Sequence, residues 1–394
     1  MWRGRPTWVE VDLDAIADNV RALKAWVGPQ VELMAVVKAN AYGHGVVPVA
    51  RVVIENGATR LAIACVDEGV QLRQAGVTAP ILVLGYSPAW EAPRIVAGGL
   101  TPTVNTWELA LALAETSAAM GVVTPVHVKI DTGMGRFGLL PDEALGFVQG
   151  LVALPGLSLE GIWTHFASAD ESDKSYTYRQ MRVFREVLNV LKAHGISARC
   201  HHAANSAATL DVRDTHLDMV RCGIALYGIY PSAEVSRGVK LRPALSWKSR
   251  VGRLRCLPAG SAISYNCTFT TDCSTNVALV PVGYADGLSR RLSNNGEFLV
   301  RGSRARILGR VCMDQCVVAV VGTLGVCQDD EVVLIGRQNG AEITADELAA
   351  RCDTVAYEVV CGIGNRVPRL YFQGGRLVAV DNGVTLHPPP DPAS

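Results

Sequence analysis

Eight short apolar stretches alternate with helical stretches between residues 31 and 225, and this alternation constrains the fold more than any other feature. The apolar stretches are residues 31–38, 60–66, 80–85, 100–104, 125–131, 157–166, 198–203 and 216–225. Such alternation is typical of a doubly wound open sheet or of a closed (β/α)8 barrel. Polar motifs follow the first, fifth, sixth, seventh and eighth stretches, and the strand ends of a barrel bring such motifs together. We therefore predict a (β/α)8, TIM-like barrel.

The pattern changes after about residue 231. From residue 241 the chain reads as short β-type runs separated by Gly, Pro and Asn. These runs are 244–257, 277–281, 297–300, 305–311, 315–321, 331–335 and 376–380, with one helical stretch at 345–351. We expect a barrel domain over 1–240 and a mainly β-strand domain over 241–394, with a disordered proline-rich tail from His387 onward. A further strand at 8–13 precedes the alternation and can pack with the second domain.

Composition excludes several classes of partner. The 394 residues carry 37 basic and 37 acidic side chains without a basic stripe, so neither nucleic acid nor a membrane surface is expected as a partner. No apolar run reaches the roughly 18 residues of a membrane span, and the N-terminus has no signal core. Eleven scattered cysteines, several in apolar runs, indicate reduced thiols in a cytoplasmic protein. Cys312 and Cys316 alone do not make a zinc site, so no metal is expected.

The stretch AVVKANAYGHG, from Ala35 to Gly45, holds the first candidate for chemistry. Lys38 ends an apolar strand, where desolvation lowers the pKa of a lysine from about 10.4. A neutral amine is a nucleophile that condenses with an aldehyde to a Schiff base. The glycines that follow allow the backbone to approach a ligand closely.

Later strand ends carry residues suited to anions. Arg136 lies in the glycine-rich stretch VKIDTGMGRFG, where its paired N–H groups suit a carboxylate or a phenolate. Asn205 and Ser206 open a helix in HHAANSAATL, which suits a phosphate. Gly223 and Ile224 follow the eighth strand, where (β/α)8 barrels often bind phosphate.

Several motifs together resemble the alanine racemase family, in family order and over about residues 6 to 380. They are VVKANAYGHG, VKIDTGMGRFG, THFASADE, HHAANSAATL, MVRCGIALYGIYPS, VPVGYADGLSRR, GRVCMDQ and YEVVCGIGNRVPR. The resemblance implies a pyridoxal 5'-phosphate (PLP) enzyme that interconverts L- and D-alanine by a two-base mechanism and supplies D-alanine for peptidoglycan. It also implies a homodimer whose active sites are shared between subunits.

The resemblance also assigns roles to residues. Lys38 would hold PLP and act on the D-face of the substrate, and Tyr265 would act on the L-face. The other cofactor-binding residues would be Tyr42, His165, Asn205, Ser206, Arg221, Gly223, Ile224 and Tyr357. Arg136 and Met313 would bind the substrate, while Asp170, Tyr284, Arg290 and Arg310 would line the entrance. Lys129 would be the lysine that CO2 often carbamylates.

Two of these assignments have consequences for chemistry. Arg221 would face the pyridine nitrogen, and an arginine keeps its proton to a pKa above 12, so the ring would withdraw electrons less strongly. Fewer transamination side reactions would follow. In SAISYNCTFTT, Tyr265 stands at the family's second-base position, but Asn266 and Cys267 depart from the usual pattern after it.

Three alternatives remain open at this point. The first is a racemase for serine or for several amino acids, against which the bulk of Tyr357 argues. The second is a PLP-dependent decarboxylase of the ornithine or diaminopimelate type, whose CESGD-like motif this chain lacks. The third is a non-catalytic, single-barrel PLP-binding protein, which would have no β domain.

Overall fold

The computed structural model describes residues 4–383 and 386–387, so most of the tail expected to be disordered lies outside the described residues. The chain forms two compact units. One contains 15–41 and 46–243, and the other contains the chain up to Asp14, the turn 42–45 and the chain from Ala244 on. The main division falls at residues 243 and 244, near the expected boundary, and the first strand lies with the C-terminal residues as expected, whereas the four-residue turn there was not expected.

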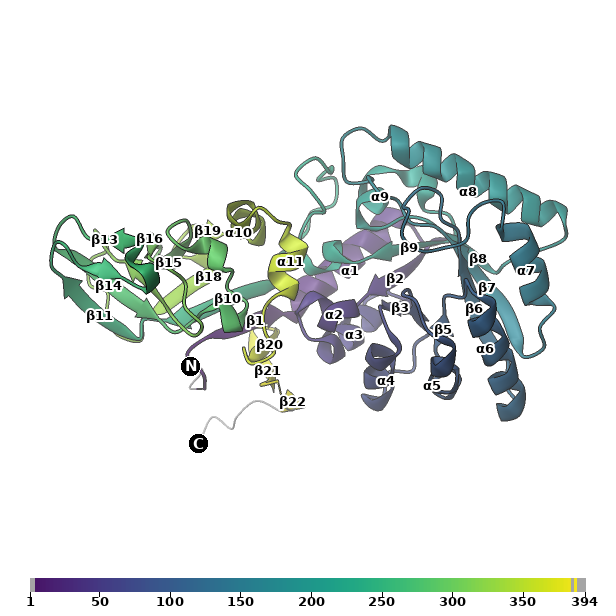
Figure 1. Ribbon diagram of the computed structural model, residues 1–394, viewed down its shortest axis with the longest axis horizontal. Coiled ribbons are helices and arrows are strands. Elements are labelled where there is room, and N and C mark those ends of the chain that lie inside the picture. The colour runs from purple at the N-terminus through teal and green to yellow at the C-terminus, as the bar shows by residue number, and fades with distance from the viewer. Residues whose placement is uncertain (1–3, 384–385, 388–394) are drawn as a thin grey trace. The chain divides into compact units, whose positions relative to one another are not determined.

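Eight parallel strands form the barrel unit (Figure 1). They are β2 (Glu32–Val36), β3 (Arg60–Ile63), β4 (Ile81–Val83), β5 (Thr101–Pro102), β6 (Thr124–Lys129), β7 (Leu157–Trp163), β8 (Cys200–His202) and β9 (Met219–Cys222). Strand pairing gives the orders β9-β2-β3-β4-β5 and β6-β7-β8. Two seams close the ring: Val104 N donates to His127 O at 2.8 Å, and Arg221 N donates to Ala204 O at 2.9 Å. The (β/α)8 prediction is confirmed.

Helices separate the barrel strands, and all of them except the short α2, whose residues have left-handed backbone angles, lie around the outside of the strands (Figure 1). They are α1 (Leu13–Val27), α2 (Lys38–Tyr42), α3 (Val46–Glu55), α4 (Val66–Gln74), α5 (Ala92–Ala97), α6 (Trp107–Met120), α7 (Ala144–Val152), α8 (Ser175–Ala193) and α9 (Ser206–Asp211). The longest, α8, buries Met181, Phe184 and Leu191 at helical spacing. Among the described residues, no helix combines the length and apolar character that a membrane span requires.

The second unit is built on a long mixed sheet, ordered β11-β14-β17-β16-β15-β18-β10-β1-β20-β21-β22 with β19 beside β18. Its strands are β1 (Trp8–Asp12), β10 (Leu245–Arg250), β11 (Arg253–Leu257), β14 (Thr275–Val280), β15 (Glu297–Val300), β16 (Ser303–Leu308), β17 (Cys316–Ala319), β18 (Glu331–Gln338), β19 (Ala341–Ile343), β20 (Arg369–Gln373), β21 (Arg376–Asp381) and β22 (Leu386–His387). Strand β1 pairs antiparallel with β10 and parallel with β20. The N-terminal strand thus belongs to the core of the C-terminal unit.

The structure departs from the sequence reading in a few elements of this unit. The run 244–257 forms two strands, β10 and β11, which pair with different neighbours. Between them, Gly252 N donates to Leu279 O in β14, the strand that pairs with β11. Helix α10 (Ala345–Cys352) was expected, whereas α11 (Ala356–Cys361) and β20 were not. A short pair, β12 (Ala262–Ile263) and β13 (Phe269–Thr270), flanks a turn that carries Tyr265.

Candidate active site

Lys38 lies at the end of β2, separated from it only by Val37, and the preceding residues Met34 to Val37 are buried, as the sequence predicts. The backbone after it is unexpected. Ala39, Asn40, Ala41 and Tyr42 all have φ between 52° and 54°, which makes a left-handed turn without a glycine. Left-handed backbone costs roughly 1–2 kcal/mol for each such residue. Strain of this kind gathers at functional sites and persists only where surrounding contacts enforce it.

Two side chains of the barrel unit hold this turn. Glu68 accepts from Ala39 N at 2.6 Å through one carboxylate oxygen and from Ala64 N at 2.7 Å through the other. Asn40 Oδ1 accepts from Val46 N at 2.8 Å, at the start of α3. Glu68 therefore ties the segment after Lys38 to the loop after β3, and the position of the lysine depends on it.

The glycines after Lys38 have a different role from the one expected. A Cβ on Gly43 would lie 2.1 Å from Val360 O, and one on Gly45 would lie 1.7 Å from the Tyr371 hydroxyl. Both glycines are therefore required by close packing within the unit that contains residues 42–45, in place of a ligand's approach. In the same unit the rings of Tyr42 and Tyr357 lie 6.1 Å apart, so two of the expected cofactor residues are neighbours.

Lys129 ends β6 and is almost fully buried. Its Nζ donates to Phe137 O at 2.5 Å and lies 5.3 Å from the centre of the Trp163 ring. Burial, followed by the charge of Arg136, lowers the pKa of Lys129 to about 8. This amine is therefore partly neutral near physiological pH.

The loop that carries Arg136 is organised by Asp131. One oxygen of its carboxylate accepts from the backbone N–H groups of Gly133, Met134 and Gly135 at 2.8–3.1 Å. The other oxygen accepts from Arg136 N at 3.0 Å. Although burial opposes ionisation, these four N–H groups leave the pKa of Asp131 below its ordinary value. The Arg136 side chain is exposed, but Asp131 holds the backbone that carries it in place.

Arg221, in β9, is buried and makes contacts only with neutral groups. Its Nη2 donates to Thr164 O at 2.7 Å and Ala203 O at 2.9 Å, and lies 3.3 Å from His165 Nδ1. Its Nη1 lies 2.8 Å from His202 Nδ1. Within the described part of the chain no carboxylate forms an ion pair with this guanidinium. Burial lowers the pKa of Arg221 to about 9.

His165 is surrounded by positive charge. Burial lowers its pKa well below 6.5, and the charges of Arg221, Arg136, Lys129 and Lys38 lower it further, in that order. Four cations from the ends of three barrel strands, β2, β6 and β9, therefore act on one neutral imidazole. Such a site favours a ligand with several negative groups.

The expected phosphate residues also lie together. Asn205 caps α9, accepting from Ala208 N at 3.0 Å, as predicted. Ser206 Oγ accepts from Gly223 N at 2.9 Å and from Ala225 N at 3.4 Å, which places Ile224 beside it in the chain. The Ser206 hydroxyl, which follows β8, thus lies against the backbone amides of the segment that follows β9.

In the other unit, Tyr265 and Met313 share one hollow of about 480 Å³, lined also by Ser264, Cys312, Asp314 and Gln315. Tyr265 is 69% exposed and lies in a turn rather than in a strand. Asn266 and Cys267, which depart from the family pattern, both have positive φ. Asparagine tolerates that conformation well, so the departure is compatible with a tight turn.

Of the expected entrance residues, Asp170 belongs to the barrel unit, while Tyr284, Arg290 and Arg310 belong to the other. Tyr284 N donates to Cys312 O at 3.0 Å, which joins its turn to the Met313 loop. Arg290 is exposed, and Arg310 is half-buried with its Nε unbonded in a buried position.

Asp286 was not singled out in the sequence, yet it organises the loops around Tyr284 and Met313 within this unit. Its fully buried carboxylate accepts from Arg5 at 2.5 Å, from Arg366 at 2.6 Å and from Gly283 N at 3.0 Å. Arg366 also donates to Asp314 at 2.7 Å, next to Met313 in the chain. The only signal in the sequence was one acidic residue in a glycine-rich motif.

The fold and these residues define a two-part enzyme, with an amine and a set of cations on a (β/α)8 barrel and an exposed tyrosine on a β unit. Models of two known domains match the chain: the alanine racemase N-terminal domain over residues 11–231 and the alanine racemase C-terminal domain over 244–371. The chain belongs to the alanine racemase family, a family of isomerases.

Individual relatives agree with this assignment. The alanine racemase of Symbiobacterium thermophilum is 50% identical over 93% of this chain and 97% of its own length, and that of Halothermothrix orenii is 48% identical over the same shares. Among solved structures, alanine racemase from Bacillus anthracis with bound L-Ala-P has a TM-score of 0.92 at 43% identity, covering 97% of this chain and 99% of that one. Alanine racemase from Clostridium difficile 630 has a TM-score of 0.93 at 38% identity, covering 98% and 100%.

Proposed function

We propose that this chain is an alanine racemase that binds PLP through Lys38 and interconverts L- and D-alanine. The observation that carries the proposal is the convergence of Lys38, Lys129, Arg136 and Arg221 around the neutral His165. PLP brings a phosphate and a phenolate, and the substrate brings a carboxylate. The cations match these anions, and the buried Arg221 lacks a carboxylate of its own among the described residues, so the residues present fit the cofactor.

Each residue then has a task. When bound, PLP supplies an electron sink that acidifies the hydrogen on the substrate's Cα. Inversion requires one group to remove a proton and another to return one on the opposite face. We assign the D-face to Lys38 Nζ and the L-face to the Tyr265 hydroxyl. Arg136 and the Met313 N–H hold the substrate carboxylate, which fixes Cα between the two bases.

The remaining residues bind the cofactor. Arg221 would donate to the pyridine nitrogen, and His165, which follows β7, would support Arg221 through the contact of 3.3 Å between them. Ser206 and the backbone amides of Gly223 and Ile224 would hold the phosphate, with Gly223 N turning from Ser206 Oγ to the ligand and Asn205 capping the helix that Ser206 begins. Tyr42 and Tyr357, whose rings are neighbours, would also bind the cofactor, and the bulk of Tyr357 would limit the size of the substrate. Because Arg221 keeps its proton, it would leave the pyridine nitrogen of bound PLP unprotonated, which would favour return of the proton to Cα over transamination.

Lys129 is proposed to react with CO2. With a pKa of about 8, about a fifth of its amine is neutral at pH 7.4, and the neutral amine is the nucleophile. The resulting carbamate would carry a negative charge next to Arg136 and orient it.

We also propose a homodimer in which each site takes Lys38 from one chain and Tyr265 from the other. The hollow that holds Tyr265 and Met313 is open, and these side chains are 69% and 53% exposed. A catalytic tyrosine needs a dry, shaped surrounding, which the partner's barrel would supply. Asp170, Tyr284, Arg290 and Arg310 would line the entrance to the completed site.

The chain is further proposed to work in the cytoplasm, where it would supply D-alanine for peptidoglycan. Its eleven cysteines are all free, six of them exposed, which suits a reducing compartment.

The test is racemisation itself, followed by the change in optical rotation with alanine, serine and other amino acids. Alanine should react fastest in both directions. Lys38→Ala and Tyr265→Phe should each lose at least a hundredfold in rate, while Lys192→Ala and Tyr178→Phe on the exposed face of α8 serve as matched controls. Faster turnover of serine would favour the broader racemase, and release of CO2 would favour a decarboxylase.

A further inference from the structure

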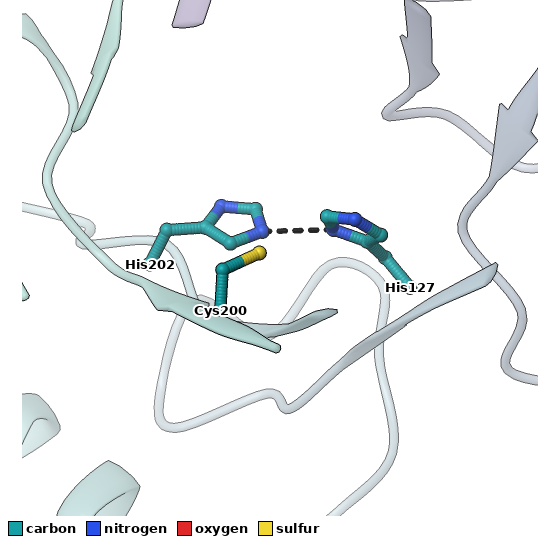
Figure 2. Close-up of side chains that lie close together, drawn as sticks. All are labelled: His127, Cys200 and His202. Carbon is teal, nitrogen blue, oxygen red and sulfur yellow. Dashed lines mark hydrogen bonds between the residues drawn. The ribbon is translucent and has the colours of Figure 1, made fainter. Parts of the chain in front are cut away.

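Three polar side chains cluster inside the barrel, next to Arg221, and have no part in the chemistry described so far. His127 comes from β6, and Cys200 and His202 come from β8; all three are buried. Figure 2 shows the two imidazoles facing one another, with the sulfur of Cys200 beside the bond that joins them. Nδ1 of His127 and Nε2 of His202 lie 2.9 Å apart.

The hydrogen bonds of this cluster have one possible direction. Arg221 can only donate, so Nδ1 of His202 must accept, and its proton must lie on Nε2. His202 Nε2–H then donates to His127 Nδ1, and His127 Nε2–H donates to Glu160 Oε2 at 3.3 Å. Glu160 can only accept when ionised. A donor-only group at one end and an acceptor-only group at the other therefore fix both tautomers.

These hydrogen bonds are incompatible with a metal ion bound by His127, Cys200 and His202. A metal bound between the imidazoles would displace the proton that joins them, and His202 could release it only as a costly anion, since Arg221 already occupies its other nitrogen. Burial also raises the pKa of the Cys200 thiol to about 12, so the thiolate that metals prefer is scarce.

Glu160, at the end of these hydrogen bonds furthest from Arg221, is held by ion pairs near the N-terminal ends of the barrel strands. Glu160 pairs with Arg60 at 2.9 Å, and Arg60 pairs with Glu32 at 3.1 Å. The hydrogen bond from His127, together with Arg60, lowers the pKa of Glu160 to about 2. The hydrogen bonds from Arg221 through His202 and His127 to Glu160 are called the relay below. Next to Glu160, Gly161 leaves space for the relay, since a Cβ there would lie 2.4 Å from Cε1 of His127.

We propose that Glu160 and His127 are positioning residues that act on Arg221 through His202. They hold His202 as a neutral acceptor, which fixes the guanidinium while the nearest anion of the relay stays two imidazoles away. Nε–H and the second Nη1–H of Arg221 have no acceptor in the described part of the chain. The relay thus keeps a charged donor edge available for a neutral aromatic nitrogen. The last step rests on the proposed function, in which that nitrogen belongs to PLP.

The first test does not depend on the cofactor. In the full-length protein as purified, labelled with 15N-histidine, both His127 and His202 should be neutral and protonated on Nε2 at pH 7.5. The assignments come from single substitutions. A ring protonated on Nδ1, or a positively charged ring, would overturn the relay even if the enzyme is an active racemase. Stoichiometric Zn²⁺ binding that Cys200→Ser abolishes would overturn it as well.

The second test uses the PLP-loaded enzyme and variants matched to the bond directions. His127→Leu breaks the relay, whereas His127→Gln keeps one acceptor and one donor. Glu160→Gln keeps the acceptor but removes the charge, and Cys200→Ser changes a neighbour outside the relay. We expect His127→Leu and Glu160→Gln to shift the absorption maximum of bound PLP and lower kcat about tenfold with KM little changed, the size typical of a lost outer-shell partner. His127→Gln should recover most of both effects. Equal spectra and kcat in Glu160→Gln and Cys200→Ser would refute the role, whereas an inactive wild type would refute only the proposed function.

Discussion

The fully buried His202 makes the stability of this protein depend on pH in a calculable way. Burial, followed by the charge of Arg221, lowers its pKa well below 6.5 in the folded state. The unfolded chain binds a proton at about 6.5. Because the folded-state pKa is the lower one, the contribution to stability is present above pH 6.5 and is lost as the pH falls. Between pH 7.5 and 5.5 a histidine that stays neutral when folded contributes a loss of about 1.4 kcal/mol.

The assay compares the wild type with His202→Asn by urea unfolding at pH 7.5, 6.5 and 5.5, both at saturating PLP. The variant is expected to be less stable throughout, since Arg221 and His127 lose a partner, but it should lose about 1.4 kcal/mol less than the wild type over this range. The comparison of slopes cancels the other titrating groups. Parallel pH profiles for the two proteins would show that His202 is not held neutral, and would refute the reasoning.

Three further predictions concern the barrel. Lys38→Ala should abolish the visible-edge absorption of bound PLP, and a band that survives dialysis of the variant would exclude this lysine as the attachment point. Arg221→Glu, which offers a carboxylate to the ring nitrogen, should raise transamination relative to racemisation; unchanged spectra and product ratios would mean that Arg221 is not the ring's partner. Glu68→Ala removes two charge-assisted hydrogen bonds from the left-handed turn and should cost about 3 kcal/mol of stability with a weaker hold on PLP, measured by urea unfolding and dialysis, whereas wild-type values in both would show that the turn needs no such support.

The sequence predicted those parts of the site that lie within one motif or one strand end. Lys38, Arg136 and Arg221 each end or follow a barrel strand, so the alternation of strands and helices was enough to place them on one face. Asn205 caps a helix because its side chain is a good N-cap, which is a local property. Local rules of this kind also predicted the eight barrel strands.

What the sequence did not reveal depends on contacts between distant segments. Nothing near Ala39 signals a left-handed turn, because alanine rarely adopts one and Glu68 enforces it from another helix. Gly43 and Gly45 were read as room for a ligand, whereas Val360 and Tyr371 occupy the space beside them.

The relay was missed for the same reason. His127 and His202 are 75 positions apart, and a single histidine in an apolar strand carries no sign of its partner. The first strand was expected to pack with the second domain, but its pairing with β20 was not, since strand pairing is not encoded in either strand alone.

The measurement that tests the central claim most directly is complementation between two inactive variants. Lys38→Ala and Tyr265→Ala should each be nearly inactive as homodimers in both directions. After they are unfolded, mixed and refolded together, random pairing makes about half of the dimers mixed, and each mixed dimer has one site with both residues intact. Roughly a quarter of wild-type racemase activity should therefore return. Refolded mixed dimers with no activity above that of the separate variants would contradict a site that takes Lys38 from one chain and Tyr265 from the other.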